Sequence, residues 1–245
     1  MSTTKKIIAA SVATLTVGGS AVLLADSAEA GGSSSQRGRS TSISSAIGRI
    51  TSGWDDVKTY KVDGSVSVRA YGMRSKGDVD VTVDQTKPDA PSAHLTASFM
   101  GNAQDVTVID DTYYVKNGAT YTKLTEAQMK AKVSILPSNL DAVAVLKKVR
   151  PQIESVRYLG RDRVSGQSAL HYRFTVDANA LEAVAGKDLP YVDRKSKDFT
   201  VDVWLDRENR MVKNAVTYQM RRGMTISYTG LITDIDEPVE IKAPV

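Results

Sequence analysis

The sequence predicts a mainly β protein of the α+β kind, with one wide, curled antiparallel sheet of about eleven strands and helices against its concave face. Three observations carry this prediction. Apolar and polar residues alternate along most of the chain after residue 58. Asn117-Gly118 lies between two Tyr/Thr/Val-rich runs, which is a strong hairpin signal. One pronounced helical pattern, over 139–152, separates two groups of strands. A closed barrel is the competing architecture, whereas a two-sheet sandwich leaves that helix nowhere to bury its apolar side.

The first thirty residues have the organisation of an export signal. Lys5 and Lys6 form a basic start, residues 7–24 are mostly apolar, and Ala28-Glu29-Ala30 is the small-x-small pattern that signal peptidase recognises. We expect cleavage after Ala30. The alternative is an uncleaved membrane anchor, since a span needs about 20 apolar residues. Either way the protein lies outside the cytoplasmic membrane, where nucleoside triphosphates and reduced nicotinamide are not supplied.

The rest of the chain divides into a tether and one domain. Residues 31–41, GGSSSQRGRST, cannot bury apolar area and are expected to form a flexible linker. Residues 42–245 form the predicted domain. It begins with a short amphipathic helix, because the apolar residues recur at helical spacing: Ile43, Ala46, Ile47, Ile50 and Trp54.

Alternation with a period of two predicts the strands. Six are expected between residues 58 and 124, the last two being the Asn117-Gly118 hairpin. Five more are expected over 156–164, 170–176, 199–205, 211–220 and 224–235. Between the two groups, the 139–152 helix carries a narrow apolar stripe that includes Leu140, Val143 and Leu146. We expect it to lie over the sheet as a lid.

The composition gives little support to catalysis or nucleic-acid binding. The 32 Lys and Arg against 28 Asp and Glu leave a net charge of only +4. No cysteine is present, and His94 and His171 have no metal-ligand spacing. The paired carboxylates at 55–56 and 110–111 lie at element boundaries, where Asp caps helices and closes turns. We therefore expect no enzyme activity, no metal, no cofactor and no nucleic-acid partner.

What remains is apolar volume. A half-open sheet covered by helices makes a cleft of the kind that takes an apolar ligand. The alternative is that the same residues only fill a core. Side chains alternate across a strand, so each of the following sets should share one face, with Trp204 on the other. The candidate lipid-binding residues are Val66, Val68, Val79, Val81, Leu95, Phe99, Leu140, Val143, Leu146, Leu170, Tyr172, Phe174, Val201, Val203, Ile226 and Tyr228.

Three segments carry a resemblance to a known family. They are LGRDRVSGQSALHYRFTV at 159–176, TVDVWLDRENRMVKNAVTYQM at 200–220 and MTISYTGLITDIDEPVEIKAPV at 224–245. They resemble the LppX/LprG-type lipid-binding lipoproteins of actinobacteria, in the LolA-like superfamily. The resemblance implies a half-barrel with helices as lids. It also implies a carrier that moves an acylated lipid or glycolipid between envelope layers, with no covalent chemistry.

One departure from the family concerns its anchor. Family members carry a lipobox ending in cysteine, which this chain lacks. We therefore expect an exported, extracellular or envelope protein that is not lipid-anchored and contacts membranes transiently, with an envelope transporter or signalling protein as a possible partner. The alternative function is a LolA-like sensor or interaction module that binds a protein in envelope signalling.

Cleavage after Ala30 is directly testable. Amino-terminal sequencing of the exported protein should begin at Gly31, because peptidase cuts after the Ala28-Glu29-Ala30 pattern. Recovery of the intact chain from the membrane fraction would instead support the anchored form.

Overall fold

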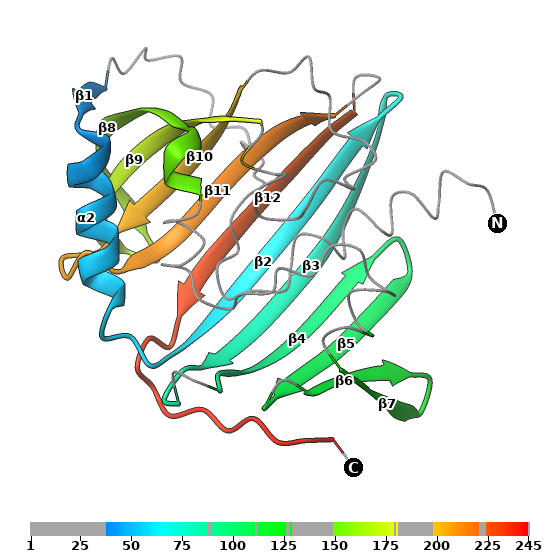
Figure 1. Cartoon of the computed structure of the whole chain (residues 1–245). Coiled ribbons are helices and arrows are strands. Elements are labelled where there is room, and N and C mark those ends of the chain that lie inside the picture. The colour runs from blue at the N-terminus through cyan, green and yellow to red at the C-terminus, as the bar shows by residue number, and fades with distance from the viewer. Residues whose placement is uncertain are drawn as a thin grey trace.

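The protein is one open antiparallel sheet with a helix across one face (Figure 1). The computed structural model describes residues 38–87, 90–110, 112–125, 128, 149–178, 180, 198–220 and 224–244. The strands are β1 (Arg39–Thr41), β2 (Thr59–Ala70), β3 (Met73–Asp84), β4 (Ser92–Phe99), β5 (Asn102–Ile109), β6 (Thr112–Asn117), β7 (Thr120–Thr125), β8 (Ile153–Val164), β9 (Gln167–Asp177), β10 (Asp198–Leu205), β11 (Met211–Met220) and β12 (Met224–Thr233). The α-helix is α2 (Ile43–Trp54), and a 3₁₀ turn, η1 (Arg150–Gln152), precedes β8.

The strand order is β1-β8-β9-β10-β11-β12-β2-β3-β4-β5-β6-β7. Every pair is antiparallel, and β12 pairs with β2, which joins the two sequence halves in the middle of the sheet. The predicted mainly β fold is confirmed, and β2–β12 correspond to the predicted runs. In the described part of the chain β1 and β7 are the two edges, so the sheet is open and the closed-barrel alternative is wrong.

The linker prediction differs from the structure at its last residues. Arg39–Thr41, expected at the end of the flexible tether, form β1 and pair with residues 156–158 of β8. These residues bury no apolar side chain of their own, so the edge of β8 supplies the pairing. Residues 31–37 lie outside the described residues.

Helix α2 packs on the sheet as its apolar spacing predicted. Ser42 caps its start by accepting a hydrogen bond from Ser45 N at 3.4 Å. Its buried side consists of Ala46, Ile47, Ile50 and Trp54, and the helix contacts β8 and β11. The Trp54 ring meets Tyr60 of β2 edge-to-face, with centroids 4.9 Å apart. We call the face that carries Tyr60 and lies under α2 the inner face.

Lid helices are not established by the structure. Among the described residues α2 is the one α-helix, and Leu140, Val143 and Leu146 of the predicted lid fall outside them. Within the described ranges, no helix has the length and apolarity that crossing a bilayer requires.

The fit of α2 against the β10–β11 turn predicts opposite effects at two glycines. A Cβ at Gly53 would collide with the main-chain carbonyl of Asn209, whereas a Cβ at Gly48 in the same helix meets nothing within 4 Å. Gly53→Ala should therefore destabilise the fold by about 1–3 kcal/mol. Gly48→Ala should stabilise it by roughly 0.5–1 kcal/mol, since alanine favours helix. Urea unfolding measures both, and equal effects would contradict this packing.

Candidate functional site

The inner face is the candidate site, because strand register brings its apolar side chains into continuous rows. One row crosses six strands through directly paired residues: Val156, Phe174, Val201, Val216, Tyr228 and Val66. Apart from Val201, each of these is less than a tenth exposed. The row joins strands from both halves of the sequence into one apolar surface.

The structure places the predicted lining residues of the described strands on this one face. From β2 to β4 they are Val66, Val68, Val79, Val81, Leu95 and Phe99, and from β9 to β12 they are Leu170, Tyr172, Phe174, Val201, Val203, Ile226 and Tyr228. Trp204 lies on the opposite face, as alternation requires. Leu140, Val143 and Leu146 lie outside the described residues. That any of these residues binds lipid stays a prediction.

Burial along the inner face is uneven. The centre is closed: Val62, Val66 and Val79 are each 1% exposed. Toward β8–β10, however, apolar side chains pack only partly against the core, among them Tyr158, Leu170 and Val201. They lie around Tyr172: Tyr158 pairs with it directly, Leu170 lies two residues before it in β9, and Val201 pairs with Phe174, two residues after it. In the described part of the inner face, apolar side chains are thus less completely covered toward β8–β10 than at the centre.

Tyr158 was missed by the sequence analysis. It pairs with Tyr172, and their ring centroids lie 5.3 Å apart. The register of β8 shifts twice, between Ile153 and Ser155 and between Tyr158 and Gly160. Each shift changes which residues face inward, so the alternation that identifies the other strands is broken in β8. Both paired residues are tyrosines, and this match is the signal by which the sequence could have indicated that Tyr158 faces inward.

Tyr228 combines complete burial with a polar group. Its ring edge and hydroxyl lie directly over Gly64 and Gly230, so a Cβ at Gly64 would come 2.7 Å from the ring. Its hydroxyl has no hydrogen-bond partner among the described residues. Burial raises the pKa of Tyr228 far above its ordinary value, with Asp63 and Asp80 adding to the shift. The phenol is therefore a neutral hydrogen-bond donor within an apolar surface.

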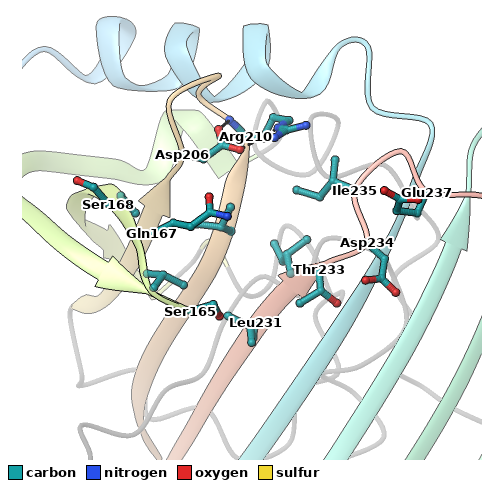
Figure 2. Close-up of a pocket in the computed structure, with 14 residues that line it drawn as sticks. Ser165, Gln167, Ser168, Asp206, Arg210, Leu231, Thr233, Asp234, Ile235 and Glu237 are labelled. Carbon is teal, nitrogen blue, oxygen red and sulfur yellow. Dashed lines mark hydrogen bonds and ion pairs between the residues drawn. The ribbon is translucent and has the colours of Figure 1, made fainter.

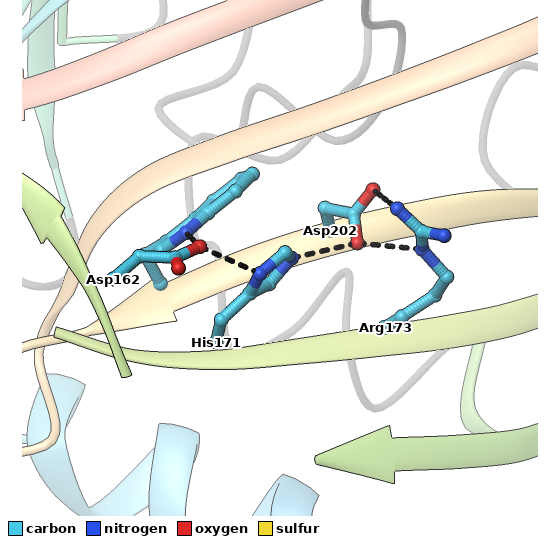
Figure 3. Close-up of polar contacts among 5 residues, drawn as sticks. Asp162, His171, Arg173 and Asp202 are labelled. Atoms are coloured by element: carbon cyan, nitrogen blue, oxygen red, sulfur yellow. Dashed lines mark hydrogen bonds and ion pairs between the residues drawn. The ribbon is translucent and has the colours of Figure 1, made fainter. Parts of the chain in front are cut away.

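The outer face of β8–β10 carries a polar network (Figure 3). His171 Nε2 lies 2.9 Å from Asp202 Oδ1, and Nδ1 lies 2.8 Å from Asp162 Oδ2. Trp204 stacks on His171 at 4.2 Å between centroids and donates its indole N–H to Asp162 at 2.9 Å. Arg173 donates to both oxygens of Asp202, at 2.8 and 2.9 Å. The network links three adjacent strands.

This network does not provide a catalytic base. Both ring nitrogens of His171 face carboxylates, so neither is placed to activate a nucleophile. Burial raises the pKa of Asp202, but hydrogen bonds from His171 and Arg173 outweigh it and hold the pKa below the ordinary value. The arrangement therefore favours an ionised Asp202 and strand-to-strand stabilisation.

The other histidine, His94, has a similar setting on the outer face. Its Nε2 lies 3.1 Å from Asp105 Oδ1, and Tyr121 donates to the same carboxylate at 3.0 Å. Burial alone would raise the pKa of Asp105, but the hydrogen bonds from His94 and Tyr121 outweigh this effect, so the pKa lies below its ordinary value. Asp105 borders a shallow hollow of about 460 Å³ over β3–β6. No group of three or more metal-ligating side chains occurs within the described ranges.

A second hollow, of about 320 Å³, lies where the β8–β9 and β10–β11 turns meet the end of β12 (Figure 2). Three of its charged lining residues are in ion pairs. Arg210 Nε donates to Asp206 at 2.8 Å, and Asp234 lies 2.7 Å from Lys61. Ser165, Gln167 and Ser168 add polar groups. Val164, Val212 and Leu231 add apolar side chains, so the walls of this hollow are mixed in character.

An open antiparallel sheet with a continuous apolar inner face and a helix across it defines an open half-barrel. Within that class the sequence makes the assignment specific: residues 50–241 match the model of the LppX_LprAFG lipoprotein family, and the chain belongs to that family. The resemblance noted in the sequence is thus confirmed. None of the curated proteins matches the chain by sequence.

Solved structures show the same fold. The crystal structure of LprF from Mycobacterium bovis has a TM-score of 0.59 and 17% identity, covering 84% of this chain and 99% of that one. LppX from Mycobacterium tuberculosis has a TM-score of 0.55 and 12% identity, covering 82% and 98%. The MucA/MucB complex from Pseudomonas aeruginosa, at a TM-score of 0.43 and 16% identity over 81% of this chain and 59% of that one, is too distant to bear on function.

The lowered pKa of Asp202 predicts a specific acid dependence. A carboxyl with a lowered folded-state pKa stabilises the protein above its unfolded pKa of about 3.9, and this contribution is lost as pH falls through the folded value. Asp202→Asn should therefore cost about 1–3 kcal/mol at neutral pH, and the difference from wild type should shrink in acid.

Thermal unfolding across a pH series measures this difference. Asp78→Asn, at an exposed carboxylate on the same outer face, is the matched control and should change stability by less than about 0.5 kcal/mol. A cost of Asp202→Asn that stays constant down to pH 3 would rule out the linkage.

Proposed function

We propose that the protein is an exported carrier that holds an acylated lipid or glycolipid against the inner face of its sheet and moves it between envelope layers, without covalent chemistry. The observation that carries this proposal is the partly covered apolar surface around Tyr158, Leu170 and Val201. Membership of a lipoprotein family supports it.

The energetics of such binding are favourable. Burial of one methylene contributes about 0.8 kcal/mol, so a 16-carbon acyl chain contributes on the order of 10 kcal/mol before ordering costs. A surface built from valine, leucine and aromatic rings can supply this contribution without a charged partner. A carrier also needs no reaction step, in keeping with His171 and Asp202 being engaged on the outer face.

Tyr228 gives the proposed site one polar contact. Its hydroxyl lacks a partner among the described residues, and burying an unpaired hydroxyl costs free energy. In the proposal, cargo binding opens this buried position, and an ester or amide carbonyl of the cargo accepts a hydrogen bond from the hydroxyl. Leu140, Val143 and Leu146, from the predicted lid helix, complete the apolar lining from the opposite side.

Export and a soluble mature form belong to the same proposal. The Ala28-Glu29-Ala30 pattern supports cleavage, and a thioether lipid anchor requires a cysteine, which the sequence lacks. We propose that the mature protein is not lipid-anchored and meets membranes transiently. An envelope transporter or signalling protein would then load or unload it, and nucleic acid is not a partner.

A size change at Val201 tests the proposal. Val201 is partly exposed on the inner face, whereas its neighbour Thr200 points to the outer face, paired with Thr175 and Thr217. Val201→Phe should fill ligand space, so lipid extracted from the natively produced protein should fall severalfold while the melting temperature changes little. Thr200→Phe, the matched control, should leave lipid content unchanged.

Lipid mass spectrometry after organic extraction measures the cargo. If Val201→Phe destabilises the fold by roughly 1–3 kcal/mol and leaves lipid content unchanged, the inner face is a packed core. Wild-type protein that yields no lipid would favour the alternative, a sensor module whose partner is a protein.

A further inference from the structure

The tip of the β2–β3 hairpin, residues 69–76, exposes large apolar side chains. Tyr71 is 64% and Met73 is 70% exposed, the highest values among the large hydrophobic side chains of the described ranges. The hairpin also extends past its neighbour, because β4 pairs with β3 only from Gly77 onward. At about 3.3 Å per residue, Met73 lies roughly 13 Å beyond the end of β4. Figure 1 shows this hairpin projecting at the upper right of the sheet.

The same tip is basic. Arg69, Arg74 and Lys76 are all exposed, and residues 64–77 contain no Asp or Glu. Arg69 and Arg74 are paired directly across the β2–β3 ladder, so both guanidinium groups lie on the outer face of the tip. The turns at the opposite end of the sheet carry carboxylates, among them Asp84, Asp110, Asp206 and Asp234.

The turn itself does not need an apolar residue. Tyr71 has φ of 53° and Gly72 has φ of 76°, both in the left-handed region that favours glycine and small polar residues. The corresponding turn between β8 and β9 uses Ser165, with φ of 49°, followed by Gly166. Tyrosine at position 71 therefore adds exposed apolar area at a place where turn geometry favours the opposite choice.

We propose that the β2–β3 tip docks onto an anionic lipid bilayer, with Tyr71 and Met73 in the interfacial layer and Arg69, Arg74 and Lys76 on lipid phosphates. A bilayer of this kind matches both features of the tip. Lipid phosphates attract its basic side chains, and the interface is where an amphipathic tyrosine ring is favoured. Each basic residue near such a surface strengthens binding roughly fivefold.

The proposal predicts a defined loss of vesicle binding. The exported protein should bind vesicles of phosphatidylcholine with about one quarter phosphatidylglycerol and bind pure phosphatidylcholine several times more weakly. Tyr71→Ser combined with Met73→Ser should weaken binding to the anionic vesicles about tenfold or more, with an unchanged melting temperature. Lys76→Ser should weaken it roughly fivefold.

Met100→Ser is the matched control. Met100 is also exposed, at 46%, and also has a left-handed φ, of 51°, but it lies at the β4–β5 turn, set back from the tip. Its replacement should keep binding within about twofold of wild type.

Several results overturn the proposal: wild-type binding that ignores lipid charge or is undetectable, a double variant that binds like wild type, or an equal loss in Met100→Ser. Wild type that binds no vesicles but captures a protein through Tyr71 would assign the tip to a protein partner instead. Vesicle binding is measured on the protein, and cargo by extraction, so either proposal can fail alone.

Discussion

The structure depends on the register between its strands, because the register decides which side chains share a face of the sheet. Each residue alternates between two faces, so a one-residue slip in any strand pair would send a whole apolar set to the outer face. The pairing of β12 with β2 is central, because it joins the amino-terminal and carboxy-terminal strands into one surface. At this junction Gly230 faces Gly64, and the absence of two side chains lets the ring edge and hydroxyl of Tyr228 lie directly over them. The junction is thereby filled by one residue that also carries the donor of the proposed site.

Irregularities in the register separate the polar chemistry from the apolar face. The shift between Tyr158 and Gly160 keeps Tyr158 opposite Tyr172 on the inner side, while Asp162, further along β8, turns outward to His171. Another register shift, in the β10–β11 pair, lies between Trp204 and Leu205, directly after the position where Trp204 stacks on His171. Lys213 lies 4.5 Å above the Trp204 ring and extends the cluster to β11. The charged groups of this network thus stabilise the sheet from the outer face, whereas on the inner face Arg161 of β8 lies opposite Leu170.

The sequence predicts the parts of the fold that rest on local periodicity. Alternation identified β2–β12 and the inward face of β9, β10 and β12, and helical spacing identified α2. It could not predict β1, whose residues have no apolar pattern and pair only because the β8 edge is present. Nor could it bring together Asp162, His171 and Asp202, which lie on three different strands and meet only through two ladders and a register shift. Periodicity describes one strand at a time, whereas these contacts require the register between strands.

Strand β2 belongs both to the inner face, where lipid binding is proposed, and to the tip that is proposed to dock on a membrane. Its inward residues run in one line from the closed centre at Val62 through Val66 and Val68 to Ala70, directly before Tyr71 at the tip. Met73 pairs with Ala70 and so continues the inner face beyond the end of β4. The outward residues of the same hairpin, Arg69 and Arg74, belong to the charged face. These β2 side chains are buried, with Val66 1% and Val68 3% exposed, so a docked tip would present Tyr71 and Met73 to the bilayer while the apolar line behind them stays covered. The tip and the partly covered surface around Tyr158, Leu170 and Val201 are thus two separate apolar regions joined by a buried core, which is why either proposal can fail without the other.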